Sequence, residues 1–136
     1  MSAYREKMSE TPLQIGDAVP HFVTHSVGGS VVDYSSIWQR RNLVLVTLLP
    51  TPAGDPYVTD LTGRTSAFDE QECTCVVTTE PIVGLPAPGL LVADRWGEIV
   101  HLVTPHAVSE LPSGDQLLQW LEAIEYRCPE CEGEAR

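Results

Sequence analysis

The sequence predicts an α/β fold in which a central mixed β-sheet is flanked by helices, and three segments carry this prediction. Residues 43–49 (LVLVTLL) form a continuous apolar run rich in branched side chains, which is typical of a strand covered on both faces. Residues 90–93 and 98–103 are apolar strands joined by the turn sequence DRWG, which predicts a hairpin. After residue 113, apolar residues recur at helical spacing. A chain of 136 residues, 43% of them hydrophobic, suits a single domain.

The N-terminal part of the chain leads into this domain. Residues 1–12 are polar and are expected to form an arm, and the domain itself is expected to span residues 13–126. Residues 13–22 form a turn-rich opening segment, in which Ile15, Val19 and Phe22 are the expected buried anchors. Gly28 and Gly29 predict a hairpin between strands at 23–24 and 30–32. A short helical turn at 33–38 follows, capped by its first residue.

The middle of the chain alternates between irregular and regular segments. Residues 50–58 contain three prolines and one glycine, so we expect no regular structure there. A short, irregular helix is expected within 59–70, followed by a second strand at 75–79.

The last regular element is a helix that begins at the capping sequence of residues 113–115. We expect Pro129 to end it, because proline cannot donate the next backbone hydrogen bond. Residues 127–136 then form a polar tail that contains two cysteines. The apolar positions that predict the helix are Leu117, Leu118, Leu121 and Ile124.

The charge of the chain excludes several classes of partner. Its formal net charge is −11 and no basic stripe is visible, so the chain should repel nucleic acids and anionic membrane surfaces. No segment approaches the roughly 20 apolar residues that a membrane helix needs, and the N-terminus lacks the apolar run of a signal peptide. We therefore expect a cytoplasmic protein with a protein partner, without nucleic-acid binding or membrane insertion. The oligomeric state does not follow from the sequence.

The order of strand, irregular crossover, strand, hairpin and terminal helix is that of a thioredoxin-like sandwich. Residues 15–22 (IGDAVPHF), the glycine hairpin, Ile37-Trp38 and residues 43–50 resemble the opening of the redoxin and peroxiredoxin family, the alkyl hydroperoxide reductase and thiol-specific antioxidant group. Residues 88–99 (PGLLVADRWGEI) resemble the later strand and turn of the same family. The resemblance covers residues 13–126 and implies an oxidoreductase or antioxidant role.

The chain departs from this family where peroxide would be attacked. In the family, a proline that ends the first central strand is followed by threonine or serine at the fourth position and by the reactive cysteine at the seventh. Counting from Pro50 gives Gly54 and Tyr57. A tyrosine with a pKa of about 10 is a poor nucleophile at neutral pH, so peroxidase activity is not expected.

The resemblance also implies a substrate groove. Pro88 stands where the family has an arginine, and it matches the cis-proline that lines the groove of thioredoxin-like proteins, with Pro86 as the alternative. Pro88 and Tyr57 are therefore the expected residues of a substrate groove.

Four cysteines occur in two close pairs, Cys73-Thr-Cys75 and Cys128-Pro-Glu-Cys131. Close pairs of soft thiolates suit metal or redox chemistry. Alternation along a strand places Cys73 and Cys75 on one face, and the last helix should return Cys128 and Cys131 to the start of that strand. Four thiolates suit tetrahedral zinc, with iron as a lesser alternative and two disulfides as the oxidised one.

Two functions follow from these cysteines. One is thiol-disulfide exchange, with Cys128 and Cys131 as the catalytic couple. The alternative is a non-catalytic binding or assembly subunit in which all four cysteines hold a structural metal. The second explains the cysteines better, because the C-terminal end of a helix raises the pKa of a nearby thiol and so disfavours the reactive thiolate.

Overall fold

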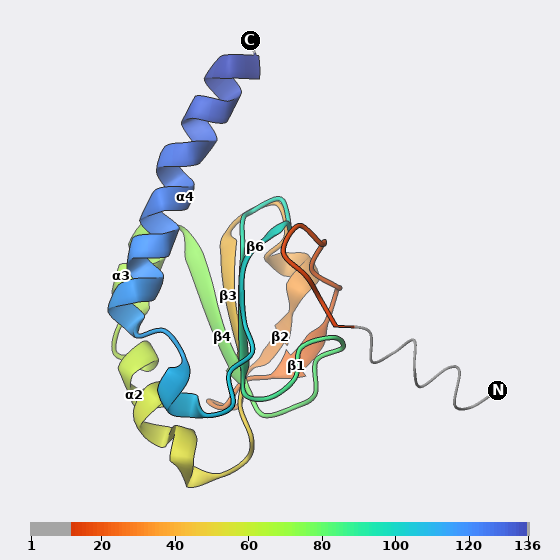
Figure 1. The fold of residues 1–136 in the computed structure, drawn as a ribbon, viewed down its shortest axis with the longest axis vertical. Coiled ribbons are helices and arrows are strands. Elements are labelled where there is room, and N and C mark those ends of the chain that lie inside the picture. Colours follow the sequence, from red (N-terminus) through yellow and green to blue (C-terminus); the bar gives the residue numbers. More distant parts are fainter. Residues whose placement is uncertain (1–11, 136) are drawn as a thin grey trace, which may run out of the picture.

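The computed structural model describes the backbone of residues 12–135 and the side chains of residues 12–124 (Figure 1). Its elements follow one another as β1 (Val23–His25), β2 (Val31–Asp33), η1 (Tyr34–Ser36), β3 (Asn42–Thr47), η2 (Pro52–Gly54), α2 (Asp55–Thr62), α3 (Thr65–Glu70), β4 (Cys73–Thr78), β5 (Gly89–Ala93), β6 (Ile99–Val103), η3 (Val108–Glu110) and α4 (Gly114–Ala135). The η elements are single 3₁₀ turns.

The main sheet is mixed, as predicted, with the strand order β4-β3-β5-β6. Strand β3 pairs parallel with β4 and antiparallel with β5, which in turn pairs antiparallel with β6. All six residues of β3 are buried. This confirms the central strand predicted from the apolar run at 43–49. A strand that has neighbouring strands on both edges and packed layers on both faces exposes no side chains to water, so its residues can all be apolar.

Two hydrophobic layers cover the sheet. On one face, Leu61 of α2, Phe68 of α3 and Leu117 of α4 pack against β3, β4 and β5. On the other face, the opening segment and the residues after β2 supply Phe22, Tyr34 and other core side chains. Figure 1 shows the three helices on one side of the sheet and the β1–β2 hairpin on the other. The arrangement is the expected thioredoxin-like sandwich.

The opening segment is partly as predicted. Val19 and Phe22 are buried, but Ile15 is 64% exposed, so its assignment as a core anchor is wrong. The reason is a turn at residues 15–17 that bonds to β6: Gly16 N–H donates to the carbonyl oxygen of Ile99, and Ile99 N–H donates to that of Asp17. The backbone of this turn faces the sheet and the side chain of Ile15 faces water.

The glycine hairpin is confirmed, with β1 and β2 antiparallel and Gly29 at a φ of +94°. The short helical turn that follows is also confirmed. It forms as η1, and the carboxylate of Asp33 accepts a hydrogen bond from the N–H of Ser35. The later hairpin forms as well, because the Asp94 carboxylate accepts from the N–H groups of Trp96 and Glu98 and shapes the turn between β5 and β6.

The expectation of no regular structure at 50–58 is wrong. Pro52 begins η2, and Pro56 lies in the first turn of α2. The first N–H groups of a helix have no partner within the helix, so a proline there loses no hydrogen bond. These prolines therefore start helices instead of preventing them.

The terminal helix begins as predicted, with the Ser113 hydroxyl accepting from the N–H of Gln116 at 3.2 Å. Leu117, Leu121 and Ile124 are buried against the sheet. The prediction that the helix ends at Pro129 is wrong, because α4 continues to Ala135. A single proline removes one backbone hydrogen bond, and the glutamates and alanine around it favour helix. Of the helices in the described part of the chain, none is long and apolar enough to span a bilayer.

Candidate functional site

A cavity of about 710 Å³ lies between the end of β3, the residue before β5 and the loop that leads to α4. The pairing of β3 with β5 places Thr47 opposite Gly89, so Pro88 lies beside the segment that follows β3. The Ala87–Pro88 peptide is cis, as predicted. We call this space the Pro88 cavity; its lining residues are Leu49, Thr51, Ala53, Pro56, Tyr57, Asp60, Pro88, His106, Ala107, Val108, Ser109, Leu111 and Ser113.

Tyr57 and Pro88 line the same cavity, whereas the substrate groove that the resemblance implies stays a prediction. The Tyr57 hydroxyl donates a hydrogen bond of 2.7 Å to the carbonyl oxygen of Pro112. Burial raises the pKa of Tyr57, and the nearby Cys75 and Asp60 raise it further. Its phenol is therefore neutral near pH 7, and its proton is already donated to a backbone oxygen. Tyr57 therefore supports a wall of the cavity, and its phenol is a poor nucleophile near pH 7.

The carboxylate in the Pro88 cavity has a structural role. Asp60 accepts hydrogen bonds from Arg64 Nε at 2.9 Å and from the N–H of Gly114 at 3.2 Å. Arg64 also bonds Asp115 at 2.6 Å, so this group ties α2 to the start of α4. With Asp60 engaged in this way, most of the remaining lining is proline, alanine, leucine and valine. Such a surface suits apolar side chains of a ligand.

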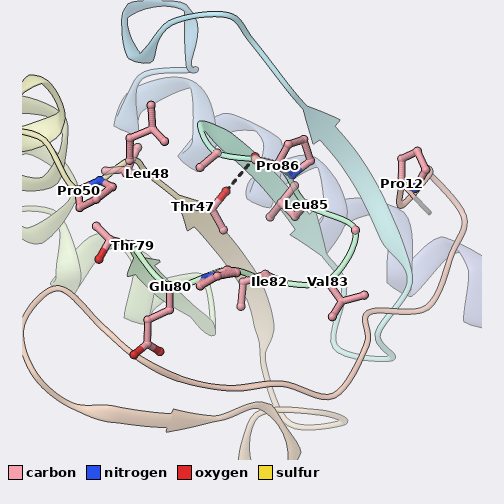
Figure 2. A pocket seen from close by; sticks show the side chains of 14 residues that line it. Pro12, Thr47, Leu48, Pro50, Thr79, Glu80, Ile82, Val83, Leu85 and Pro86 are labelled. Carbon is pink, nitrogen blue, oxygen red and sulfur yellow. Dashed lines mark hydrogen bonds between the residues drawn. The ribbon is translucent and has the colours of Figure 1, made fainter. Parts of the chain in front are cut away.

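A second cavity, of about 680 Å³, lies on the other side of the segment after β3 (Figure 2). We call it the Pro12 groove. Leu49 and Pro50 form one of its walls, the loop of residues 79–87 forms another, and Leu49 also lines the Pro88 cavity. Thr47 Oγ1 donates to the carbonyl oxygen of Pro86 at 3.1 Å and anchors the loop to β3. This groove was not predicted from the sequence, although the run PIVGLPAP at 81–88 indicates a shaped loop.

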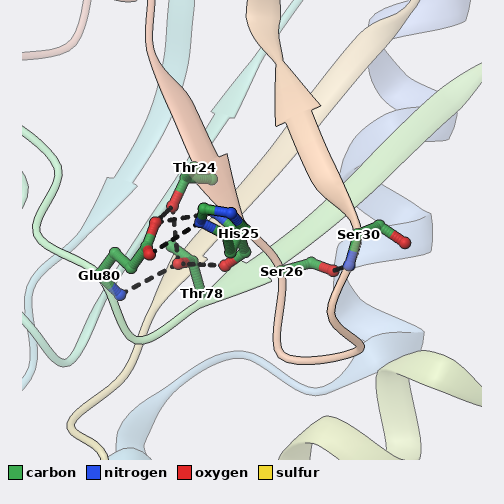
Figure 3. Close-up of polar contacts among 6 residues, drawn as sticks. All are labelled: Thr24, His25, Ser26, Ser30, Thr78 and Glu80. Atoms are coloured by element: carbon green, nitrogen blue, oxygen red, sulfur yellow. Dashed lines mark hydrogen bonds and ion pairs between the residues drawn. The ribbon is translucent and has the colours of Figure 1, made fainter.

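A polar network holds the start of that loop against the β1–β2 hairpin (Figure 3). Glu80 accepts hydrogen bonds from Thr24 Oγ1 at 2.7 Å and from the N–H of His25 at 2.8 Å, and its other oxygen lies 3.0 Å from His25 Nδ1. The hydrogen bond from Thr24 and those from His25 lower the pKa of Glu80 to about 2. Thr78 Oγ1 lies 2.8 Å from Thr24 Oγ1. This network was not predicted from the sequence.

Cys73 and Cys75 both pack on the face of β4 that α4 covers. Cys73 is 1% exposed and Cys75 is partly buried. Burial raises the pKa of Cys75 to about 12 and raises that of Cys73 further. The pair begins β4, and Cys75 packs against the same core cluster as Tyr57, whose pKa it raises. The side chains of Cys128 and Cys131 lie outside the described residues.

Among the side chains that the structure describes, no group of three or more histidine, cysteine, aspartate or glutamate residues is placed to hold a metal ion. The described side chains include only two of the four cysteines predicted as ligands, so the four-cysteine site stays a prediction.

The fold is shared with solved thioredoxin-fold enzymes. The chain superposes on the reduced 2-Cys peroxiredoxin of Plasmodium vivax with a TM-score of 0.68 and 15% identity, covering 85% of this chain and 83% of that one. A yeast mitochondrial 1-Cys peroxiredoxin gives a TM-score of 0.69 at 14% identity, covering 87% and 79%. The thioredoxin domain of a thiol-disulfide oxidoreductase from Bacteroides vulgatus gives 0.57 at 15% identity, covering 82% and 98%.

These comparisons define the class of the chain as a thioredoxin-fold protein whose structure is similar to peroxiredoxins and thioredoxin-domain oxidoreductases. No protein-family model matches the chain, and no curated protein matches it.

Proposed function

We propose that this chain is a thioredoxin-fold binding protein that holds an extended peptide in the Pro88 cavity and does not reduce peroxides. The observation that carries the proposal is the cavity itself, about 710 Å³ in volume and bounded by Pro88 and by Tyr57. Its mostly apolar lining offers contacts for side chains, and the charged Asp60 is committed to Arg64 and Gly114. A pocket of this size with few polar groups is an ordinary binding site for an apolar ligand segment.

The residues around this cavity support the proposed lack of peroxidase activity. Residues 50–58 contain no cysteine, and Tyr57 stands where the resemblance to the peroxiredoxin family implies the reactive thiol. That phenol has a raised pKa and is bonded to Pro112. Cys73 and Cys75 lie in β4 and are not among the residues that line the Pro88 cavity, and burial keeps their thiols protonated.

Selection of random peptides on the immobilised protein tests the proposal. Enriched peptides are then titrated by calorimetry against the wild-type protein and against Ala53→Trp, which places a large ring in the Pro88 cavity. We expect Ala53→Trp to weaken binding about tenfold or more, the loss that corresponds to about 1.4 kcal/mol. Ala123→Trp is the matched control, because Ala123 is exposed on α4 and lies outside the lining.

Two results contradict the proposal. One is that no peptide is enriched over a surface without protein. The other is that enriched peptides bind Ala53→Trp and Ala123→Trp equally well, which would place their site elsewhere.

We propose a second function for the cysteines, a structural zinc site of Cys73, Cys75, Cys128 and Cys131. The observation that favours it is that Cys73 and Cys75 share a buried cluster with Leu117, Leu121 and Ile124 of α4. In the sequence, positions 128 and 131 follow residue 124 at four and seven residues, which continues the spacing 117, 121, 124. Zinc would supply the positive charge that buried thiolates need.

Metal analysis of protein purified under reducing conditions tests this site. We expect about one zinc per chain, and Cys131→Ser should release it, whereas Ser113→Ala should retain it. A reduced protein without zinc or iron contradicts the proposal. If that protein instead forms a reversible disulfide between Cys128 and Cys131, thiol-disulfide exchange replaces the structural site as the function of this pair.

A further inference from the structure

We propose that the Pro12 groove is the docking site of the chain's own N-terminal segment, residues 1–11, with Tyr4 and Met8 as its apolar anchors. The Pro12 groove is a different cavity from the Pro88 cavity, in which we propose that a peptide binds.

The position of Pro12 in the groove supports residues 1–11 as the segment that binds there. Pro12 is part of the groove's lining, so residue 11 is attached directly at its edge. The N–H of Leu13 donates to the carbonyl oxygen of Gly84 at 3.0 Å, which joins the start of the described chain to the loop that forms the groove. Figure 2 shows Pro12 at one end of the groove and Leu48 and Pro50 at the other. Any chain that precedes Pro12 therefore begins beside this apolar surface.

The segment has the length to cover the groove. At about 3.5 Å per extended residue, Met8 reaches up to about 14 Å from Pro12, and Tyr4 reaches up to about 28 Å. Because the segment is tethered at Pro12, its local concentration at the groove is high, of millimolar order for short flexible connections. A free peptide lacks this high local concentration, so residues 1–11 have an advantage over it in binding to the groove.

The groove has apolar surface that an occupant would cover. Val83 is 61% exposed and Leu49 is 52% exposed, above the buried side chains of Ile82 and Leu85. Large apolar side chains exposed together mark an interaction surface. Met1, Tyr4 and Met8 are the large apolar residues of the segment and can supply the matching surface.

The charges of the segment and of the groove are also compatible with binding of residues 1–11. The segment has two basic side chains, Arg5 and Lys7, and two acidic ones, Glu6 and Glu10, so its formal charge is zero and the whole −11 resides in residues 12–136. Glu80, which lines the groove, is ionised at neutral pH because its pKa is lowered to about 2. A segment without net charge is not repelled by this carboxylate, whereas an acidic peptide is.

The test measures how far a soluble paramagnetic chelate relaxes the methyl signals of the full-length protein. Val31 is the internal reference, because its side chain is 65% exposed, close to the 61% of Val83, and lies on the β1–β2 hairpin. We expect the chelate to relax Val83 and Leu49 at least about threefold less than Val31. In the double variant Tyr4→Ser, Met8→Ser, the relaxation of Val83 should rise to that of Val31. The matched variant Ser2→Ala, Ser9→Ala should leave the protection of Val83 unchanged.

Three outcomes overturn the inference. Equal relaxation of Val83 and Val31 in the wild-type protein would show an uncovered groove. Protection that persists in the Tyr4→Ser, Met8→Ser variant would assign the groove to another occupant. Protection that grows with protein concentration would assign it to a second copy of the chain. None of these outcomes bears on peptide binding in the Pro88 cavity, which Ala53→Trp tests separately.

Discussion

The hydroxyl of Tyr57 donates a hydrogen bond of 2.7 Å to the carbonyl oxygen of Pro112. These residues lie 55 positions apart in the chain, one in α2 and the other directly before α4. The bond joins the segment after β3 to the loop before α4 and closes one side of the Pro88 cavity. At the position where the related fold is expected to place a reactive thiol, this chain therefore has a structural hydrogen bond.

Tyr57→Phe should lower the free energy of unfolding by about 1–2 kcal/mol, because it leaves the carbonyl oxygen of the buried Pro112 without this partner. Urea unfolding followed by circular dichroism measures the change. Thr59→Ser, an exposed change in the same helix, should stay within about 0.5 kcal/mol of the wild type. Equal stabilities of Tyr57→Phe and the wild type would show that water replaces the phenol at no cost.

Gly89→Ala should destabilise the protein by about 1–3 kcal/mol or more. A Cβ at residue 89 would collide with the carbonyl oxygen of Pro86 and press against Thr47 Oγ1, at the point where the 79–87 loop joins β5. Gly28→Ala is the control, since the nearest atom to its Cβ would be Ser26 Oγ at 3.8 Å. Thermal unfolding compares the two variants, and similar midpoints would contradict the close packing between this loop and β3.

The network of Glu80 should make stability depend on acid pH. Hydrogen bonds from Thr24 and His25 lower the pKa of the Glu80 carboxyl from 4.5 to about 2. The stability that the ionised carboxylate contributes is therefore present above pH 4.5 and is lost as the pH falls through about 2. Glu80→Gln should therefore be less stable than the wild type at pH 7, and the difference should shrink near pH 2. Urea midpoints at several pH values measure it, and a difference independent of pH would contradict the role of the ionised carboxylate.

Peroxide reduction should be negligible at pH 7. The loop after β3 contains no thiol, and the pKa of Tyr57 is raised above its ordinary value. Stopped-flow consumption of hydrogen peroxide should match buffer alone, both for the wild type and for a variant with all four cysteines replaced by serine. Rapid consumption that survives those replacements would assign chemistry to the Tyr57 loop. Rapid consumption that disappears in Cys128→Ser would assign it to the C-terminal pair.

Local patterns in the sequence predicted most of the fold because their causes are local. The apolar run at 43–49, rich in branched side chains and followed by a proline, favours a covered strand, and β3 is buried along its whole length. The DRWG turn contains its own stabilising group, the Asp94 carboxylate. The errors at 50–58 and at Pro129 come from treating proline as a helix breaker, although its effect depends on its position within the helix.

The site was only partly predictable. The resemblance to the redoxin family predicted that Tyr57 and Pro88 lie together, and the antiparallel pairing of β3 with β5 brings the end of β3 beside the start of β5. The sequence placed Cys73 and Cys75 on one face by strand alternation. It gave no indication that Glu80 would bind Thr24, because these residues are 56 positions apart and no periodicity connects them.

The sequence by itself therefore determined the strands, the turns, the helix start at Ser113 and the lack of a thiol after β3, since each depends on neighbouring residues. Only the tertiary structure decided which surfaces are hollow, which polar groups are already paired and how far the pKa values of Tyr57 and Glu80 move. Cavities form where distant segments leave space between them, and a pKa shifts when folding removes water or supplies a distant partner. The Pro88 cavity and the Pro12 groove arise in this way, from segments that meet only in the folded chain.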